Sequence, residues 1–306
     1  MPDTRPLDGK ALLVTGAGGG IGRAIAIEAA KAGAMVVVND LGATLDGHRT
    51  SSAAAEATVS EIEAAGGRAV TNGDDVSRPE GAQAMVRAAT DAFGRLDAVV
   101  NNAGILRDCF FHKMTSEDFD AVIKVHLYGA FNVSRAAADV MRQQNSGSLI
   151  HMTSTSGLVG NLAQANYSAA KLGVTALSKS IALDLARWNI RSNCIAPFAW
   201  SRMTSSIKVD SPEQEARVNR MKEMLPEKIA PLTLYLASDI GCETTGQIFA
   251  VRNNEIFLMS QSRPTRSVHH SPGWDFNSIA NYAIPALRES YHALDISADV
   301  FAWDPI

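Results

Sequence analysis

A tyrosine and a lysine stand four residues apart in the stretch Tyr167-Ser-Ala-Ala-Lys171. On a helix, positions i and i+4 lie on one face, about 6 Å apart along the axis. Free tyrosine has a pKa of about 10, which is poorly matched to proton transfer at neutral pH. Because a nearby ammonium stabilises phenolate, we expect Lys171 to lower the pKa of Tyr167 and make it an acid/base group.

Ser154 precedes Tyr167 by thirteen residues and ends a predicted strand. Its hydroxyl is suited to hydrogen-bond a substrate oxygen and to stabilise a developing alkoxide. The three side chains together predict hydride chemistry, in which a nicotinamide exchanges hydride, Tyr167 moves the proton and Lys171 also holds the ribose hydroxyls of the cofactor. The alternative is an exposed Tyr/Lys pair without catalytic function. The spacing of Ser154 and a glycine-rich loop at residues 15–22 argue against that interpretation.

A glycine-rich segment, TGAGGGIG at 15–22, joins the first predicted strand to the first predicted helix. Glycines there let the chain turn tightly and bring backbone N–H groups close to a pyrophosphate, beside the positive end of the helix dipole. The strict fingerprint G-x-G-x-x-G is not met, because Ile21 stands at its closing position. A turn without a ligand is the alternative. We expect these loop residues to contact the cofactor: Gly16, Gly20, Ile21 and Gly22.

Asp40 ends the second predicted strand, eighteen residues after Gly22. A carboxylate there accepts hydrogen bonds from ribose hydroxyls and repels a 2′-phosphate, which favours NAD over NADP. The alternative is that Asp40 only begins a surface turn with Leu41 and Gly42. Ligands of open α/β sheets bind outside the carboxyl ends of strands, so two further strand ends fit the same cofactor. They add these predicted contacts: Asp75, Val76, Asn102, Ala103 and Gly104.

Short apolar runs alternate with longer helical patterns along the first 250 residues. This alternation predicts a parallel sheet covered by helices on both faces. The predicted strands are 11–16, 35–40, 68–73, 96–102, 148–154, 190–197 and 245–251, and the predicted helices are 21–33, 56–67, 80–93, 117–144, 165–188 and 278–291. We interpret residues 1–251 as one domain. Residues 252–306 form a C-terminal extension whose apolar content predicts packing on its own or a neighbouring subunit.

The composition is typical of a globular protein, with 46% hydrophobic and 20% charged residues. A formal charge of −4 without a basic tract disfavours nucleic acid and acidic membrane surfaces as partners. The three cysteines fit neither a metal site nor a disulfide framework, which favours a reducing cytoplasm. The apolar runs are too short to span a membrane, and the N-terminus lacks the apolar core of a signal peptide.

These motifs together resemble the classical short-chain dehydrogenase/reductase family. The residues that carry the resemblance are T-G-x-x-x-G-x-G at 15–22, N-N-A-G at 101–104, Ser154 and Tyr167-x-x-x-Lys171, within about residues 8–250. The resemblance implies a doubly wound Rossmann fold with a seven-stranded parallel sheet, and reversible alcohol/carbonyl chemistry. It also implies a homodimer or homotetramer.

Further segments resemble the (3R)-hydroxyacyl-CoA dehydrogenase domains of peroxisomal multifunctional enzymes of type 2 and their free-standing bacterial relatives. They are VVVNDLG at 36–42, NNAGILRD at 101–108, VHLYGAF at 125–131, QANYSAAKLG at 164–173 and SRMT at 201–204. This resemblance implies NAD-linked oxidation of 3-hydroxyacyl-CoA thioesters. Our leading hypothesis is such an enzyme; the alternatives are a hydroxysteroid or other secondary-alcohol dehydrogenase, and a non-catalytic dinucleotide-binding scaffold or sensor.

Three positions depart from the family pattern. His126 aligns with the catalytic asparagine that helps to hold a water beside the lysine; it either serves there or is a packed helix histidine. Phe198 replaces the glycine after Pro197, whose main chain is expected to contact the nicotinamide. Asn253 and Asn254 replace a pair of glycines near the last strand.

The resemblance to the family also implies a substrate lid at about residues 198–225. Trp200, Met203 and Met221 offer adaptable apolar surface for an acyl or polycyclic group, or simply pack the lid. A second set of lid residues is suited to meet the acidic groups of coenzyme A, or to form a solvated charged helix. These are Arg202, Lys208 and Arg220.

Overall fold

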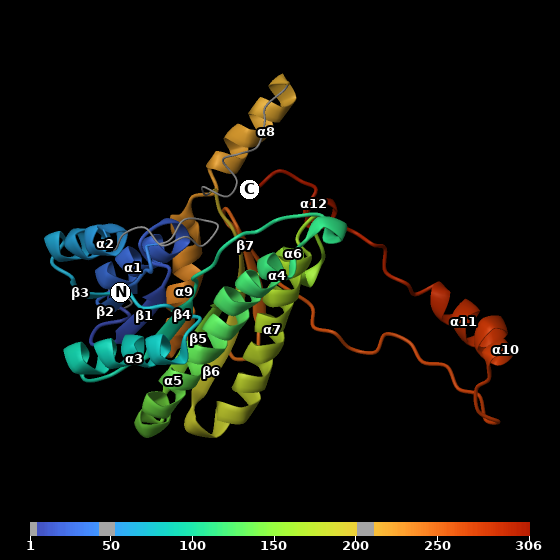
Figure 1. Cartoon of the computed structure of the whole chain (residues 1–306), viewed down its shortest axis with the longest axis horizontal. Coiled ribbons are helices and arrows are strands. Elements are labelled where there is room, and N and C mark those ends of the chain that lie inside the picture. The colour runs from blue at the N-terminus through green and yellow to red at the C-terminus, as the bar shows by residue number, and fades with distance from the viewer. Residues whose placement is uncertain (1–4, 43–52, 201–210) are drawn as a thin grey trace.

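Eight strands form one sheet in the order β3-β2-β1-β4-β5-β6-β7-β8. The computed structural model describes residues 5–42, 53–200 and 211–306 (Figure 1). The strands are β1 Ala11–Thr15, β2 Met35–Asn39, β3 Arg68–Asn72, β4 Ala98–Asn101, β5 Gly147–Met152, β6 Ile190–Phe198, β7 Ile248–Arg252 and β8 Glu255–Leu258. The first seven are parallel, whereas β8 runs antiparallel to β7.

Helices cover both faces of this sheet, as Figure 1 shows. The helices of the body are α1 Gly20–Lys31, α2 Ala53–Ala64, α3 Pro79–Phe93, α4 Ser116–Ile123, α5 Gly129–Gln144, α6 Thr155–Leu158, α7 Ala165–Leu185, α8 Pro212–Lys222 and α9 Ala230–Ala237. α1 and α9 pack with β1 and β2 in one apolar core. α3 and α5 build the second core on the opposite face. The central strands β1, β4 and β5 are buried throughout, which explains their continuous apolar sequence.

The order of the strands reverses between β1 and β4. The chain builds outward from β1 through β2 to β3, and then returns to place β4 on the other side of β1. Loops that follow β1 and β4 therefore diverge and leave a crevice at the carboxyl ends of the strands. The predicted doubly wound α/β fold is confirmed.

The predicted strand number is wrong by one, because the sequence analysis placed no strand after residue 251. Asn253 and Asn254 form a two-residue turn, in which Asn253 has a left-handed φ of 53°. Asparagine tolerates that conformation, and two-residue turns of this kind join antiparallel strands. The turn allows β8 to pair with β7, with Arg252 opposite Glu255. The C-terminal extension therefore begins within the sheet.

After β8 the chain leaves the body and later returns to it (Figure 1). The predicted helix 278–291 is observed as three short consecutive elements, α10 Phe276–Ser278, a π-helical turn Ile279–Ala283 and α11 Ile284–Arg288. These elements lie away from the sheet, at the far right of the view. A last short helix, α12 Ser297–Val300, lies beside α6 on the body. Within the described ranges, no helix is both long and apolar enough to cross a bilayer.

Candidate active site

A cleft of about 520 Å³ opens at the carboxyl ends of the strands. It brings together twelve of the fifteen residues that the sequence analysis assigned to the cofactor and the chemistry. The predicted residues that line it are Gly16, Ile21, Asp40, Asp75, Val76, Asn102, Ala103, Gly104, His126, Tyr167, Lys171 and Pro197. Gly20, Gly22 and Ser154 lie next to lining residues in the chain.

The glycine-rich loop has a shape that side chains would not permit. Gly16 and Gly20 have φ values of 64° and 51°, a left-handed conformation that favours glycine. A Cβ on Gly22 would lie 2.3 Å from the carbonyl oxygen of Gly16 and 2.5 Å from the side chain of Asn102. The start of α1 thus packs directly against the turn, which suits the close approach of a pyrophosphate.

Asn102 fixes this loop from the neighbouring strand end. Its Nδ2 donates to the carbonyl oxygens of Thr15 and Gly16, at 2.9 and 3.1 Å. In return, the hydroxyl of Thr15 accepts from the backbone N–H groups of Asn102 and Ala103. Asn102 therefore shapes the loop with its side chain, a function that the sequence analysis did not foresee. Thr15 opens the motif at 15–22, but the sequence analysis predicted no role for its hydroxyl.

Asp40 begins a turn and also lines the cleft, while its contact with a ribose stays a prediction. Its Oδ1 accepts from the N–H of Gly42 at 2.7 Å, so it does stabilise a turn. Its Oδ2 accepts from the N–H of Gly18 at 2.8 Å, and the residue also lines the cleft. Asp75 lines the cleft too, while its carboxylate accepts from the N–H of Ser77.

Tyr167 and Lys171 lie in the first turns of α7, and Ser154 precedes α6. Burial raises the pKa of Tyr167 to about 12, while a hydrogen bond with Ser154 lowers it. Lys171 lies beside the phenol ring, with Nζ 5.5 Å from the ring centroid, and donates to the carbonyl oxygen of Met152 at 2.6 Å. Burial also lowers the pKa of Lys171 to about 8. The prediction that Lys171 lowers the pKa of Tyr167 is therefore wrong for this structure, because desolvation dominates.

Close packing of α6 on α7 sets the distance between Ser154 and Tyr167. A Cβ on Gly157 would lie 2.8 Å from the backbone nitrogen of Leu172. Ser154 itself caps α6, because its hydroxyl accepts from the N–H of Ser156 at 3.1 Å. Glycine at position 157 is the sequence signal for this contact.

A polar network beside Ser154 was missed by the sequence analysis. The amide of Gln164 donates to the carboxylate of Asp108 at 2.8 Å and accepts from the hydroxyl of Ser156 at 2.9 Å. Burial raises the pKa of Asp108, and its negative charge raises the pKa of Tyr167. The network joins the segment after β4 to the loop that carries the predicted catalytic residues.

His126 lies in a π-helical turn, Lys124–Tyr128, between α4 and α5. Such single turns are frequent at functional sites. Its Nε2 lies 2.9 Å from the carbonyl oxygen of Ile105 and 3.2 Å from the nitrogen of the same residue. Its Nδ1 is buried and has no partner among the described residues. Burial, together with the charge of Lys171, lowers the pKa of His126 to about 3, so the ring is neutral.

A small cavity separates His126 from Lys171. It measures about 10 Å³, which is about the volume that one water needs, and both side chains line it with Asn101 and Thr15. The ring of His126 also stands edge-on to the phenol of Tyr167, with the centroids 5.2 Å apart. The histidine is thus both packed and adjacent to the predicted proton-transfer groups.

The predicted lid lies only partly in the described ranges. Met203, Arg202 and Lys208 fall outside them. The backbone of Trp200 donates to the carbonyl oxygen of Met224, which ties the end of β6 to the segment after α8. Arg220 lies on α8 and forms an ion pair with Asp304 at 3.1 Å, and its contact with coenzyme A stays a prediction.

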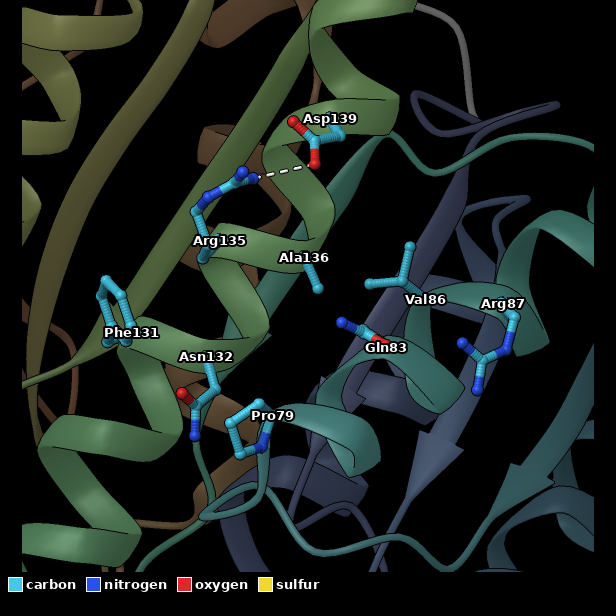
Figure 2. Close-up of a pocket in the computed structure, with 9 residues that line it drawn as sticks. All are labelled: Pro79, Gln83, Val86, Arg87, Phe131, Asn132, Arg135, Ala136 and Asp139. Atoms are coloured by element: carbon cyan, nitrogen blue, oxygen red, sulfur yellow. Dashed lines mark hydrogen bonds and ion pairs between the residues drawn. The ribbon is translucent and has the colours of Figure 1, made fainter.

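A second groove of about 440 Å³ lies on the outside of the body, between α3 and α5 (Figure 2). Pro79, Gln83 and Arg135 line it, and Arg135 forms an ion pair with Asp139 at 2.9 Å. It contains none of the predicted site residues. Among the described residues, no cluster of His, Cys, Asp or Glu is arranged to hold a metal ion.

The strand order and the glycine-lined cleft at its reversal are those of dinucleotide-binding α/β proteins. A family model described as short chain dehydrogenase matches residues 10–212, more than half of the chain. The chain belongs to the short-chain dehydrogenase/reductase family and is an oxidoreductase. Members of this family typically bind a nicotinamide dinucleotide.

Several relatives have names that refer to hydroxyacyl-CoA or peroxisomal enzymes. The chain is 47% identical over 244 residues to the mouse protein named peroxisomal multifunctional enzyme type 2; the match covers 80% of this chain and 32% of that protein. It is 39% identical over 270 residues to the hydroxyacyl-CoA dehydrogenase ChsB1 of Mycobacterium tuberculosis, covering 84% and 82%. The chain thus spans about a third of the mouse relative and most of the bacterial one.

A crystal structure of a short chain dehydrogenase from Mycobacterium avium has a similar fold. The TM-score is 0.82 at 37% sequence identity, and the similarity covers 94% of this chain and 97% of the other. The similarity therefore extends beyond residue 251 into the C-terminal extension.

Proposed function

We propose that the protein is an NAD-dependent 3-hydroxyacyl-CoA dehydrogenase that interconverts a 3-hydroxyacyl-CoA and a 3-oxoacyl-CoA thioester. The observation that carries this proposal is one cleft that contains the glycine-rich loop, Asp40, Tyr167 and Lys171. The substrate class is supported by the name of the bacterial relative, which this chain matches over most of both lengths. Family membership favours catalysis over the scaffold alternative.

Open space at Gly20 supports a dinucleotide in this cleft, because no atom lies within 4 Å of the position that a Cβ would take there. Gly16 and Ile21, on either side of it in the loop, line the cleft. Asp40 would accept hydrogen bonds from the ribose and disfavour a 2′-phosphate. For this reason we propose NAD, not NADP, as the cofactor. The other residues proposed to hold the cofactor are Gly20, Ile21, Asp75, Val76, Asn102, Ala103, Gly104, Lys171 and Pro197. When bound, the nicotinamide supplies or accepts hydride.

The protein groups handle the proton and the substrate oxygen. The hydroxyl of Ser154 orients that oxygen, and the hydroxyl of Tyr167 donates or accepts the proton at the same atom. Lys171 and His126 would share one water in the small cavity between them, so that His126 takes the place of the family's asparagine. The neutral ring of His126 can donate or accept there, because its Nδ1 is otherwise unpartnered among the described residues.

A spectrophotometric screen tests this function. NADH formation or consumption is followed with 3-hydroxyacyl-CoA or 3-oxoacyl-CoA esters, steroids and simple alcohols, each with both nicotinamide cofactors. We expect the highest kcat/KM with an acyl-CoA ester and NAD. Turnover of steroids alone would replace the proposal by the hydroxysteroid alternative.

A matched pair of variants tests the assignment of Tyr167. Tyr167→Phe removes the proton donor and should lower kcat by about 1000-fold while NADH still binds. Tyr235→Phe also removes one phenolic hydroxyl, at a partly exposed site on α9 that bonds Thr244, and should leave kcat unchanged. Equal activity of Tyr167→Phe and the wild type would refute the assignment.

A homodimer or homotetramer and a cytoplasmic location remain predictions. The segment 259–294 supports self-association, because Phe276 is 85% exposed and Leu294 fully so. Light scattering after size-exclusion chromatography measures the subunit number. Direct localisation of the protein in the cell tests the compartment. The test matters because several relatives carry the word peroxisomal in their names.

A further inference from the structure

The last residues of the chain, 295–306, connect the carboxyl ends of two neighbouring strands. We refer to them as the return segment, because they come back to the body after the projecting residues 259–294 (Figure 1). One end of the segment contacts the loop that follows β5, and the other end contacts the end of β6. Ser154 follows β5, and Pro197 lies within the end of β6.

The first contact fixes the loop between Ser154 and Tyr167. The backbone N–H and the hydroxyl of Ser297 both donate to the carbonyl oxygen of Gly160, at 3.0 and 3.2 Å. Gly160 also closes α6, because its N–H donates to the carbonyl oxygen of Thr155 at 3.2 Å. One helical turn therefore separates the hydrogen bonds of Ser297 from the catalytic hydroxyl of Ser154.

The same loop contains a strained residue that needs support. Ala163 has a left-handed φ of 59°, a conformation that costs a residue with a Cβ about 1 kcal/mol. Its carbonyl oxygen accepts from the N–H of Cys109 at 2.8 Å. This contact lies three residues after Gly160, where Ser297 contacts the same loop. Strain of this kind persists only where contacts on both sides determine the conformation. Tyr167 follows Ala163 by four residues.

The second contact anchors the return segment to the sheet. Phe301 is buried, and its ring stands edge-on to Phe198 at 4.9 Å and to Phe257 of β8 at 5.2 Å. Phe198 directly follows Pro197, which lines the cleft. Nearby, the indole of Trp303 donates to the carboxylate of Glu255 at 2.8 Å. An aromatic pair of this kind contributes about 1 kcal/mol beyond its buried area.

We propose that the return segment is a positioning element for Ser154 and Tyr167, in which Phe301 anchors the segment and Ser297 holds the catalytic loop. The inference rests on the proposed function, since it concerns the assigned catalytic hydroxyls. The contacts of Ser297, Phe301 and Trp303 all fall on the side of β5 to β8. The glycine-rich loop is held separately, by Thr15 and Asn102. Loss of the return segment's contacts should thus affect proton transfer and leave dinucleotide binding intact.

Two full-length variants with matched controls test the inference. Phe301→Ala should lower kcat about tenfold, since small displacements of catalytic groups are costly, and Phe301→Leu should restore most of it. Ser297→Ala should lower kcat about threefold, and Ser297→Thr, which keeps the hydroxyl, should match the wild type within about 1.5-fold. Phe93→Ala, at the partly buried end of α3 and outside the cleft, is the control for Phe301→Ala. The dissociation constant of NADH should stay within about twofold in every variant.

Hydrogen exchange of residues 155–164, followed by mass spectrometry, gives a readout that does not depend on turnover. Exchange there should accelerate in Phe301→Ala, while exchange in β1 and α1 stays as in the wild type. Unchanged exchange in 155–164 would overturn the inference. A higher KM with unchanged kcat would also overturn it, because the segment would then only line the substrate site. A parallel loss of NADH binding would overturn it as well. A wild-type protein that turns over no tested substrate would instead refute the proposed function.

Discussion

The two sides of the cleft are held by contacts from different parts of the chain. On the cofactor side, the loop of Gly16 is fixed by Asn102 and Thr15, at the ends of the adjacent strands β4 and β1. On the substrate side, the loop after Ser154 is fixed by Ser297, which lies 137 residues away from Gly160. The first arrangement follows from strand pairing within the Rossmann core. The second depends on a segment that leaves the body and returns.

This difference predicts that cofactor binding and turnover can be changed separately. The contacts that hold the glycine-rich loop come from the ends of paired strands of the sheet. The loop after Ser154 is held by Ser297 from the extension and by Asp108 and Cys109 from the segment after β4. Substitutions on the two sides should therefore separate cofactor binding from turnover.

Gly22→Ala should have the largest effect on the cofactor side. The new Cβ would lie 2.3 Å from the carbonyl oxygen of Gly16, so α1 must shift away from the loop. We expect the dissociation constant of NADH to rise at least about 100-fold, as measured by quenching or enhancement of its fluorescence. Gly66→Ala provides a control, because no atom lies within 4 Å of its added Cβ, although its positive φ strains the variant. Tight NADH binding by Gly22→Ala would show that this loop does not hold the dinucleotide.

Asp40→Ala should change cofactor preference without abolishing activity. It removes the charge that repels a 2′-phosphate and the acceptor for ribose hydroxyls. The ratio of kcat/KM with NAD to that with NADP should fall about 30-fold, a change of about 2 kcal/mol. Part of any fall in kcat/KM that is common to both cofactors will arise because the N–H of Gly18 then lacks its acceptor. An unchanged ratio contradicts the assignment of Asp40.

Gly157→Ala should act on the substrate side alone. Its Cβ would lie 2.8 Å from the backbone of α7 and push α6, with Ser154, away from Tyr167. We expect kcat to fall about 20-fold while the dissociation constant of NADH changes less than about twofold. If instead both quantities change together, the two sides are not independent, and the comparison above fails.

The buried histidines should make the protein less stable in mild acid. His126 has a folded-state pKa of about 3, below the ordinary value of 6.5, so the unfolded chain binds the extra proton as the pH falls below 6.5. Stability is therefore fully present above that pH and is lost below it. At about pH 5.5, proton uptake by His126 of the unfolded chain lowers the free energy of unfolding by about 1 kcal/mol, which is close to a factor of ten in the folding equilibrium.

Urea unfolding of His126→Asn at about pH 7.5 and pH 5.5 measures this contribution. The variant should lose less stability between the two pH values than the wild type does, by about 1 kcal/mol. His151, whose pKa burial lowers to about 4, remains in both proteins and contributes equally. The exposed His292→Asn is the control and should reproduce the pH dependence of the wild type. The same slope in all three proteins would contradict a neutral, buried His126.

Much of the fold was predictable because it rests on local patterns. Apolar runs marked all seven parallel strands to within a few residues, and the glycines at 33, 66 and 94 mark the ends of α1, α2 and α3. Most of the cleft residues followed from their positions at strand ends. The strand β8 was missed, since its short apolar run has no periodicity of its own and depends on the Asn253-Asn254 turn. The Gln164 network was missed because Asp108 is 56 residues away.

By itself, the sequence determined that Tyr167 and Lys171 share a helix face, that glycines form the turn after β1 and that Asp40 ends β2. These features follow from backbone geometry and from hydrophobic periodicity, which act over a few residues. Only the tertiary structure decided the direction of the pKa shift of Tyr167, the support of the loop at Gly160 by Ser297 and the placement of Phe301 against Phe198. Desolvation and packing depend on groups distant in the chain, and no local pattern encodes which of them meet.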